Sequence, residues 1–378
     1  MLQRSLVPLV VALLAGCATI QPSRALVTEA EHRALGLTPN RIEPWEDGLR
    51  TDPSASGTYE WWYLDGHLDD GSTLVVVFFT KPIDGAAGPL KPMVRVDLDR
   101  PDGTKFTRLI EIDPSNFSAS KERCDVRMGP HRFEGDLHRY SISIALPDFA
   151  AQLTLTGEVQ PWRPSAGVIT FGAKDEKYFA WLPAVPHGKL EGTLKVEDGA
   201  TLEVRGTGYH DHNWGNASLV GLVHDWYWGR AHVGPYSVIA AYITAEQGYS
   251  ANHFPLLLVA KGDDVLVGNS SHVTFSSSDV AIDEKTAKPV ASKLTWDFND
   301  AGKRVRVSFD RKKTLVELPL VEQLPGFMRF LARLSGFDGA YHRFTGEVSV
   351  EVLENDQRVD EQHHDAAVWE LMYLGHAP

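Results

Sequence analysis

Cysteine and long apolar runs are both scarce in this 378-residue sequence. Only Cys17 and Cys124 are present, so a framework of disulfides is excluded. The one long apolar stretch, residues 6–15, is shorter than the roughly 20 residues that a membrane-spanning helix needs. Neither a disulfide scaffold nor a transmembrane helix is therefore expected.

Blocks of basic residues are also absent. The 37 Lys and Arg residues against 50 Asp and Glu residues give a formal net charge of −13, without a long run of one sign. Nucleic acid is not expected as a partner, because phosphate binding needs a basic surface. The 32 Gly and 22 Pro residues are scattered rather than periodic, which excludes collagen-like and low-complexity proteins.

Several catalytic motifs are missing as well. The sequence contains no Gly-x-Ser-x-Gly elbow, no His-Glu-x-x-His pair, no phosphate-binding loop and no dinucleotide glycine fingerprint. Hydrolase, metalloprotease, kinase and dehydrogenase activities lose support, and we expect no cofactor.

The N-terminus resembles a bacterial lipoprotein signal peptide. Arg4 precedes the apolar stretch, which ends in the lipobox-like Leu14-Ala15-Gly16-Cys17. We expect residues 1–16 to be removed and a lipid on Cys17 to anchor the chain. Ala18, in place of Asp, is typical of lipoproteins on the periplasmic face of the outer membrane. The alternative is a plain secretory signal with an incidental cysteine.

Short strand-like runs dominate the rest of the chain. Asp-Gly pieces between them, such as Asp102-Gly103, are typical of hairpin turns. Segments of helical period are almost missing, except Pro325–Leu334, which predicts either a core-packing helix or a membrane-facing or lid helix. The expected strands include 72–80, 93–98, 140–146, 151–159, 201–207, 236–244, 254–260, 264–267, 293–298, 305–309 and 344–352.

This pattern predicts an all-β fold class with a pair of β-barrels. Residues 17–50 are polar and contain several prolines, which predicts a tether between the membrane and the folded part. The seam between the barrels is expected near residues 205–225. A barrel of about eight strands either fills with side chains or holds one apolar ligand.

The first of three polar and aromatic clusters is Tyr59–Gly66. On a strand, Glu60 and Trp62 share one face, opposite Trp61 and Tyr63. A carboxyl group flanked by indoles ionises poorly, so Glu60 is a candidate acid. The alternative is a salt-bridged glutamate at the start of a barrel strand.

The second cluster, Tyr209–Gly215, is the densest. His210, His212 and Trp214 share one face of an extended segment, and Asp211 lies on the other. Two histidines at this spacing can offer two metal ligands, but no sequence signal selects a third. We therefore expect no bound metal.

The third cluster is His224–His232. Alternation places Trp226, Trp228 and Arg230 together, against Asp225. A hydrophobic core does not need so many titratable and aromatic side chains, so the cluster favours a functional site. The structural alternative is a hydrogen-bonded plug where the barrels meet.

The first two clusters carry a resemblance to a known family, together with Tyr178–Pro183, Gly206–Gly208 and Trp369-Glu370. Over about residues 50–375 the sequence resembles the carotenoid 1,2-hydratase (hydroxyneurosporene synthase, CrtC) and AttH-like family. The resemblance implies two lipocalin-like (calycin) antiparallel β-barrel domains packed together, with few short helices, at residues 51–215 and 216–378. It also implies an apolar ligand, since members include isoprenoid hydratases, kievitone hydratases and fungal pericyclic cyclases.

The family's hydratase mechanism implies roles for His212 and Trp214 and for a Tyr-x-Asp motif on a following strand. The nearest equivalent here is Tyr242-Ile243-Thr244, where threonine replaces the family's acid. Hydration of an alkene begins with protonation, so another acid is needed. The candidate catalytic residues are His212, Trp214, Tyr242, Asp225, Asp211 and Glu60, and the candidate ligand-binding residues are Trp62, Tyr209, His210, Trp226 and Trp228.

The sequence leaves three functions open. The first is an enzyme, a hydratase or a related isomerase or cyclase, which hydrates a C=C bond of a long isoprenoid or polyene-like ligand through a cation. The second is a lipid-anchored carrier of apolar molecules or lipids that works with an ABC transporter. The third is a structural envelope protein, which the polar clusters disfavour. The lipobox and Thr244 favour the carrier, whereas His212, Trp214 and Tyr242 favour the enzyme.

Overall fold

A computed structural model describes residues 20–375 apart from 83–84, 198 and 324–336. The predicted lipid attachment site at Cys17 and the predicted helix Pro325–Leu334 lie outside the described residues. No described helix combines the length and the apolar character needed to cross a bilayer.

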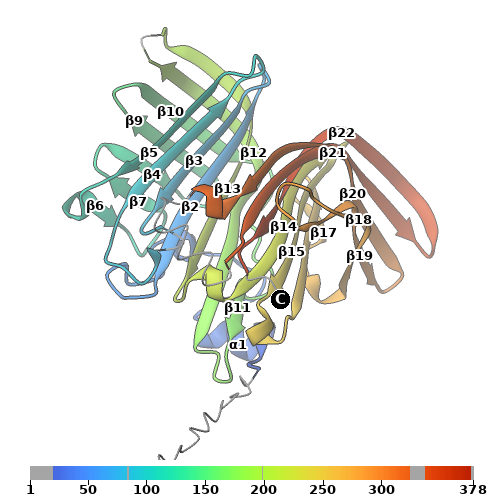
Figure 1. Ribbon diagram of the computed structural model, residues 1–378. Helices are drawn as coiled ribbons and strands as arrows, with labels where there is room; N and C mark the ends of the chain where they lie inside the picture. Colours follow the sequence, from blue (N-terminus) through green and yellow to red (C-terminus); the bar gives the residue numbers. More distant parts are fainter. Residues whose placement is uncertain (1–19, 83–84, 198, 324–336, 376–378) are drawn as a thin grey trace, which may run out of the picture.

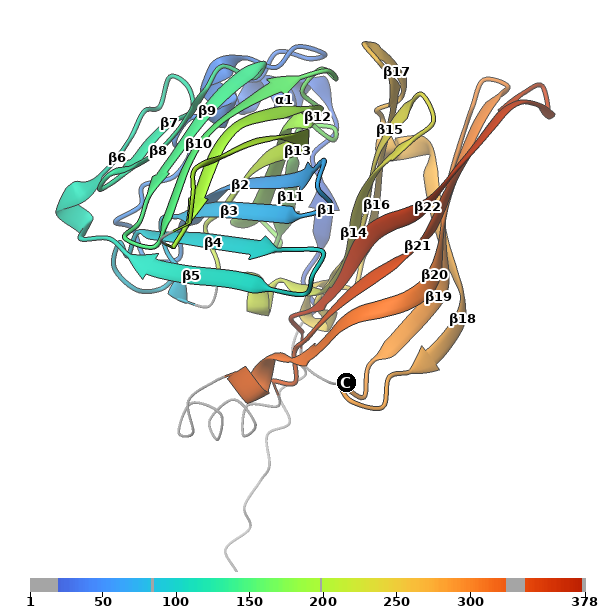
Figure 2. The same ribbon diagram turned by 90° about the horizontal axis from the view of Figure 1, so that it is seen from above.

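The N-terminal half is one 13-stranded antiparallel sheet that curls around its own core (Figures 1 and 2). Its helical turns are α1 (Glu29–Ala34), η1 (Pro44–Asp47) and η3 (Pro114–Asn116). Its strands are β1 (Ser23–Ala25), β2 (Tyr59–Leu68), β3 (Thr73–Phe79), β4 (Met93–Asp99), β5 (Lys105–Glu111), β6 (Phe117–Ala119), β7 (Asp125–Met128), β8 (His131–Gly135), β9 (Arg139–Ala145), β10 (Phe149–Gly157), β11 (Val168–Phe171), β12 (Lys177–Val196) and β13 (Leu202–Gly215). The strand order is β5-β4-β3-β2-β13-β12-β10-β9-β8-β7-β6, and β11 joins β1 to β12.

The C-terminal half is a second, 9-stranded antiparallel sheet beside the first (Figure 2). Its 3-10 turns are η4 (Leu219–Gly221), η5 (Gln247–Tyr249), η6 (Ser270–His272) and η7 (Leu320–Gln323). Its strands are β14 (Val223–Val233), β15 (Tyr236–Ala245), β16 (His253–Lys261), β17 (Asp264–Val267), β18 (Val273–Ile282), β19 (Pro289–Asp300), β20 (Lys303–Pro319), β21 (Ala340–Glu354) and β22 (Gln357–Tyr373). The strand order is β17-β16-β15-β14-β22-β21-β20-β19-β18.

The prediction of an all-β fold is confirmed. Each expected strand run overlaps a strand, and Gly71 and Gly103 take positive φ angles of 85° and 87° in the turns that follow β2 and β4. Glycine suits these turns because it has no Cβ to clash in that backbone region. The two sheets divide between Gly215 and Val223.

Residues 20–50 pack onto the folded body, mainly onto its N-terminal half, whereas the sequence predicts a tether there. β1 pairs with β11, Gln21 N donates to Gly248 O at 2.8 Å, and Asp47 of η1 is only 1% exposed. Prolines and polar residues suggested a free segment, but these side chains find partners in the folded part. From Gln21 onward the chain is therefore held against the folded body.

The alternating side chains of β15 fill two different apolar layers. Val238 and Ala240 belong to the core enclosed by the C-terminal sheet. Ile239 and Ile243 belong to a third cluster, which also contains residues of the N-terminal sheet such as Trp181. The strand is buried on both faces, so its sequence is almost continuously apolar. This third cluster joins the two halves.

Candidate active site

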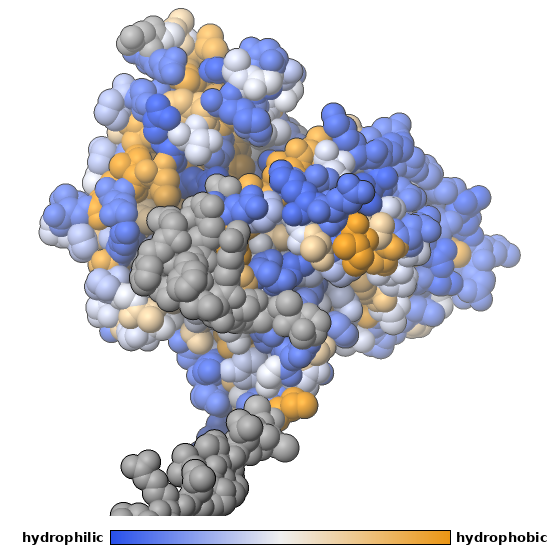
Figure 3. All heavy atoms as spheres, viewed as in Figure 1, coloured by the Kyte–Doolittle hydropathy of each residue, from blue (hydrophilic) through white to orange (hydrophobic). Residues whose placement is uncertain are grey.

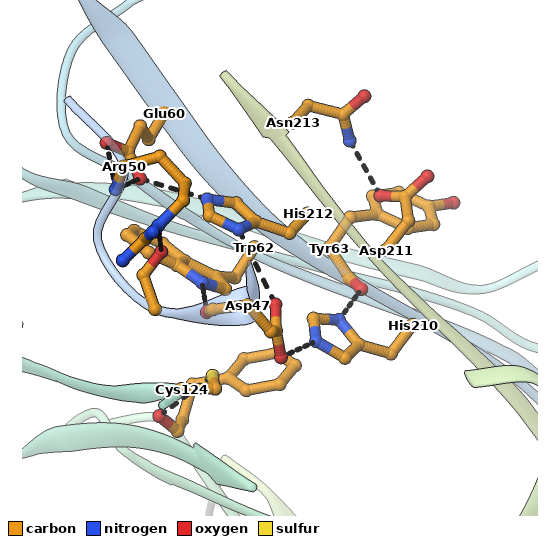
Figure 4. A network of polar contacts seen from close by, with 12 residues as sticks. Asp47, Arg50, Glu60, Trp62, Tyr63, Cys124, His210, Asp211, His212 and Asn213 are labelled. Carbon is orange, nitrogen blue, oxygen red and sulfur yellow. Dashed lines mark hydrogen bonds and ion pairs between the residues drawn. The ribbon is translucent and has the colours of Figure 1, made fainter. Parts of the chain in front are cut away.

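Strand β13 carries polar side chains on both faces, and the two faces meet different surroundings. His210 and His212 point into the N-terminal core, whereas Asp211 and Asn213 lie on the opposite side of the strand (Figure 4). This separation follows from the two-residue period of a strand. The densest cluster of the sequence therefore contributes to two separate sites.

The first site is a buried network around His212. Its Nε2 lies 2.9 Å from Glu60 Oε2 and its Nδ1 lies 3.5 Å from Asp47 Oδ1 (Figure 4). Glu60 also accepts hydrogen bonds from the backbone N–H groups of Arg50 and Thr51. Because Glu60 and His212 are fully buried and hydrogen-bonded to each other, and Glu60 also binds the backbone of residues 50 and 51, the network holds the chain that follows η1 against the sheet.

Trp62 and Trp214 pack on this histidine. The Trp62 ring is stacked on the His212 ring with centroids 4.6 Å apart, and the Trp214 ring is 4.7 Å away. Trp62 Nε1 donates to the Asp47 backbone carbonyl at 3.1 Å. The aromatic rings therefore shield the network from solvent.

The same core holds the one group in the described part of the chain with metal-ligand geometry. Ligand atoms of Asp47, Cys124 and His210 lie within 4.8 Å of one another. However, Asp47 Oδ2 already accepts from the Tyr140 hydroxyl at 2.5 Å and lies 3.2 Å from His210 Nε2. Burial also raises the pKa of the Cys124 thiol, which disfavours the thiolate that metals bind. The hydrogen bonds within this group explain why the three side chains lie close together, and a bound metal is not needed to explain it.

The second site is a cavity of about 600 Å³ between the two halves. This volume is in the range of small-molecule pockets. In the view of Figure 3, hydrophobic residues gather on the N-terminal half and near the line where the halves meet, while the C-terminal half is mainly hydrophilic. The aromatic residues of the cavity wall include Trp61, Tyr63, Trp181, Trp226, Trp228 and Tyr341.

Asp211 is the carboxyl group of this cavity with the most donors around it. Its Oδ2 accepts from Trp181 Nε1 at 2.8 Å and from the Tyr209 hydroxyl at 2.7 Å, and its Oδ1 accepts from Asn213 Nδ2 at 2.8 Å. Burial outweighs these donors and raises the pKa of Asp211 to about 6. The group can therefore exist in both protonation states near neutral pH.

Two further carboxylates lie in the cavity wall. Glu370 accepts from Trp226 Nε1 at 3.1 Å and from the Tyr341 hydroxyl at 3.0 Å, and burial raises its pKa. Asp65 behaves in the opposite way: burial opposes ionisation, but the Arg230 guanidinium lowers the pKa of Asp65. Asp65 comes from β2 and Arg230 from β14, so this ion pair joins the two halves.

The structure distributes the predicted site residues over three places. His212, Trp214, Glu60, Trp62 and His210 surround or form the buried network in the N-terminal core. Asp211, Trp226 and Trp228 line the cavity, and Tyr209 lies behind it with its ring 5.4 Å from that of Trp228.

Tyr242 and Asp225 occupy the third place, in the C-terminal half. Tyr242 stacks on Phe275 with ring centroids 3.8 Å apart. Asp225 Oδ2 lies 2.6 Å from His224 Nδ1, and Asp225 Oδ1 accepts from the Thr244 hydroxyl at 3.2 Å. The residues that the family mechanism implies, His212 and Tyr242, thus pack in different cores.

The sequence did not predict three residues of these sites: Asp47, Asp65 and Arg343, which lies on β21 in the cavity wall. Asp47 lies in a segment whose composition suggested a tether, and Arg343 lies far from every cluster. Asp65 and Arg230 stood in two of the clusters, but nothing in the sequence indicates that they pair. Trp181 and Glu370 were indicated only by the motifs that carry the family resemblance.

Comparison with known families and proteins agrees with this organisation. A family described as Diels-Alderase-like matches residues 46–314. The quinolone epoxide rearrangement protein asqO of Emericella nidulans is 28% identical over 225 residues, which cover 56% of this chain and 60% of that protein. A hydroxyneurosporene dehydrogenase of Chlorobaculum tepidum is 26% identical over 216 residues, 47% of this chain and 54% of that protein. The chain thus spans little more than half the length of these relatives.

Solved structures share the fold at low sequence identity. CghA superposes with a TM-score of 0.58 at 13% identity, over 86% of this chain and 89% of that one. A putative AttH from Nitrosomonas europaea gives 0.55 at 16% identity, over 89% and 98%. Kievitone hydratase from Nectria haematococca gives 0.51 at 14% identity, over 94% and 98%. The predicted lipocalin-like, AttH-like fold is confirmed.

Proposed function

Because the chain belongs to the Diels-Alderase-like family, we propose that it is an enzyme that transforms an apolar, unsaturated molecule in the cavity between its two halves. The chemistry that fits the site is acid catalysis through a cation, with Asp211 as the proton donor. The observation that carries this proposal is a carboxyl group with a pKa of about 6 in the wall of a cavity that is lined by several aromatic side chains.

The surroundings of Asp211 suit proton transfer in both directions. Burial keeps a fraction of the carboxyl groups protonated, about a tenth at pH 7 for a pKa of about 6. When the proton leaves, the donors from Trp181, Tyr209 and Asn213 stabilise the carboxylate that remains. The same carboxylate can take the proton back from an attacking water, so the group returns to its starting state.

The cavity also suits the positive charge that protonation creates. Trp226 and Trp228 line it, and an indole face stabilises a nearby cation by about 0.5–2 kcal/mol. Protonation of a C=C bond forms one C–H bond and leaves a cation, which water then captures as an alcohol. Protonation of an epoxide oxygen opens a C–O bond and leaves a comparable cation. A hydratase and an epoxide rearrangement protein are among the proteins that this chain resembles.

We take the substrate to be a long isoprenoid or polyene-like molecule. The aromatic wall favours an unsaturated apolar body, and the cavity volume of about 600 Å³ accommodates one small-molecule ligand. A carotenoid is one member of this class.

The first experiment identifies the ligand and follows its fate. The purified chain lacking residues 1–17 is analysed by native mass spectrometry with lipid extraction, and the extracted molecule is incubated with the protein in D₂O and in heavy-oxygen water. We expect deuterium on a carbon, and labelled hydroxyl if the product is an alcohol. A ligand released unchanged would overturn the proposed chemistry and favour the second candidate, a lipocalin-like carrier that serves an ABC transporter.

We further propose that a lipid on Cys17 anchors the protein at the periplasmic face of the outer membrane. Only residues 18–20 separate Cys17 from Gln21, whose N–H donates to the folded part, so the fold would stand close to the membrane. A clickable fatty-acid analogue should label the wild-type chain, and Cys17→Ser should lose the label and the sedimentation with outer membranes. Equal labelling of both chains would contradict the anchor.

A further inference from the structure

Arg343 is a cation of the cavity wall that has no hydrogen-bond or ion-pair partner in the described part of the chain. It lies on β21, directly across from Glu370 on β22. Among the residues that the structure describes, none forms a hydrogen bond or an ion pair with its guanidinium. A partly buried arginine without a partner costs desolvation free energy, unless a ligand binds its guanidinium.

The other cations of the same wall are each matched by a carboxylate. Arg230 pairs with Asp65, Arg95 pairs with Asp97 and Lys105 pairs with Asp99. His67, which also lines the cavity, is neutral at pH 7, because burial and the nearby Arg230 lower its pKa to about 4. Arg343 is therefore exceptional within the described part of this wall.

The neighbouring carboxyl group forms no hydrogen bond or ion pair with Arg343. A cross-strand Arg–Glu pair would ordinarily form an ion pair. Here the two Glu370 oxygens instead accept hydrogen bonds from Trp226 Nε1 and from the Tyr341 hydroxyl. Burial alone would lower the pKa of Arg343, but Tyr341, Tyr63, Glu370 and, least of these, Asp65 together raise it, so the side chain stays charged.

We propose that Arg343 binds a carboxylate at one end of an otherwise apolar ligand, so that the substrate of the cavity is an amphipathic acid. A guanidinium presents paired N–H donors that match the two oxygens of a carboxylate. The indoles of Trp226 and Trp228 would hold the unsaturated body. This inference rests on the proposed use of the cavity and deepens it, because it specifies the polar end of the substrate.

The test compares two probes that differ only in charge, cis-parinaric acid and its methyl ester, both below their aggregation concentrations. Binding is followed by polyene fluorescence with the chain lacking residues 1–17. We expect the wild type to bind the acid at least about tenfold more tightly than the ester, because hydrogen bonds between charged groups add that much affinity. Arg343→Met should remove this preference, because it should weaken binding of the acid and leave binding of the ester unchanged.

Arg95→Met is the matched control, because Arg95 lines the same cavity but is already paired with Asp97. It should keep the preference for the acid. Equal wild-type affinity for acid and ester, no binding of either probe, or an unchanged preference in Arg343→Met would each overturn the inference. The wild-type comparison decides even if Arg343→Met fails to fold.

This binding test is independent of turnover. Asp211→Asn should retain the preference for the acid, since Asp211 is proposed to transfer a proton and not to bind the carboxylate. If the wild type prefers the acid but does not turn over its extracted ligand, the result supports Arg343 and contradicts the proposed catalysis. If the extracted ligand is turned over but the acid and the ester bind equally well, the catalysis is supported and the Arg343 inference is overturned.

Discussion

Asp211→Asn should lower the turnover rate by about 10²–10⁴-fold, the usual contribution of a positioned acid or base. An amide keeps the size of the side chain but cannot supply the proton. Ligand affinity should change by less than about tenfold, because the aromatic wall is intact. The turnover rate is measured as product formed from the extracted ligand, and the affinity is measured by equilibrium binding of the same ligand. Circular dichroism checks the fold of the variant.

The pH profile gives an independent readout of the same group. Wild-type turnover needs the protonated carboxyl, so it should be highest below a pH of about 6 and fall about tenfold per pH unit above it. The residual activity of Asp211→Asn should lack this dependence. A profile that is flat between pH 5 and 8 in the wild type would exclude Asp211 as the acid.

His212→Gln is the control that separates the two polar sites. His212 is fully buried in the N-terminal core, so this change should lower stability but preserve turnover per folded molecule. If His212→Gln abolished turnover in a folded protein while Asp211→Asn retained it, the chemistry would belong to the Glu60–His212–Asp47 network. That outcome would restore the role that the family resemblance implies for His212.

Asp65→Ala should lower the free energy of unfolding by about 3–5 kcal/mol, because it leaves the buried Arg230 without its counter-charge. Arg230 lies on the other half of the molecule, so the loss should fall on the contact between the two sheets. Urea unfolding at pH 7 measures it. The lowered pKa of Asp65 means that its contribution is present above its unfolded pKa of about 4 and disappears as the pH falls through the folded value.

The double variant Asp65→Leu with Arg230→Met is the control for this pair. Replacing both charges by apolar groups of similar size removes the unpaired cation and should recover most of the stability. If Asp65→Ala were as stable as the wild type, the pair would not hold the halves together. If the double variant were no more stable than Asp65→Ala, the loss would come from packing and not from charge.

The sequence alone determined which side chains share a face of each strand. The two-residue period separates Asp211 from His212 on β13 and Trp61 from Trp62 on β2, and the structure has the same alternation. Strand runs and Asp-Gly turns likewise predicted the all-β fold, because local backbone preferences produce them.

Only the tertiary structure decided what each face meets. Tyr209, Asp211 and Asn213 line or back the cavity because the outer face of β13 lies against the C-terminal sheet, whereas His210 and His212 are enclosed by the N-terminal one. Both faces are buried, so hydrophobicity could not distinguish them. Asp47, Arg230 and Arg343 reach their sites from distant segments, and pairing between distant segments depends on packing of the whole chain rather than on local periodicity.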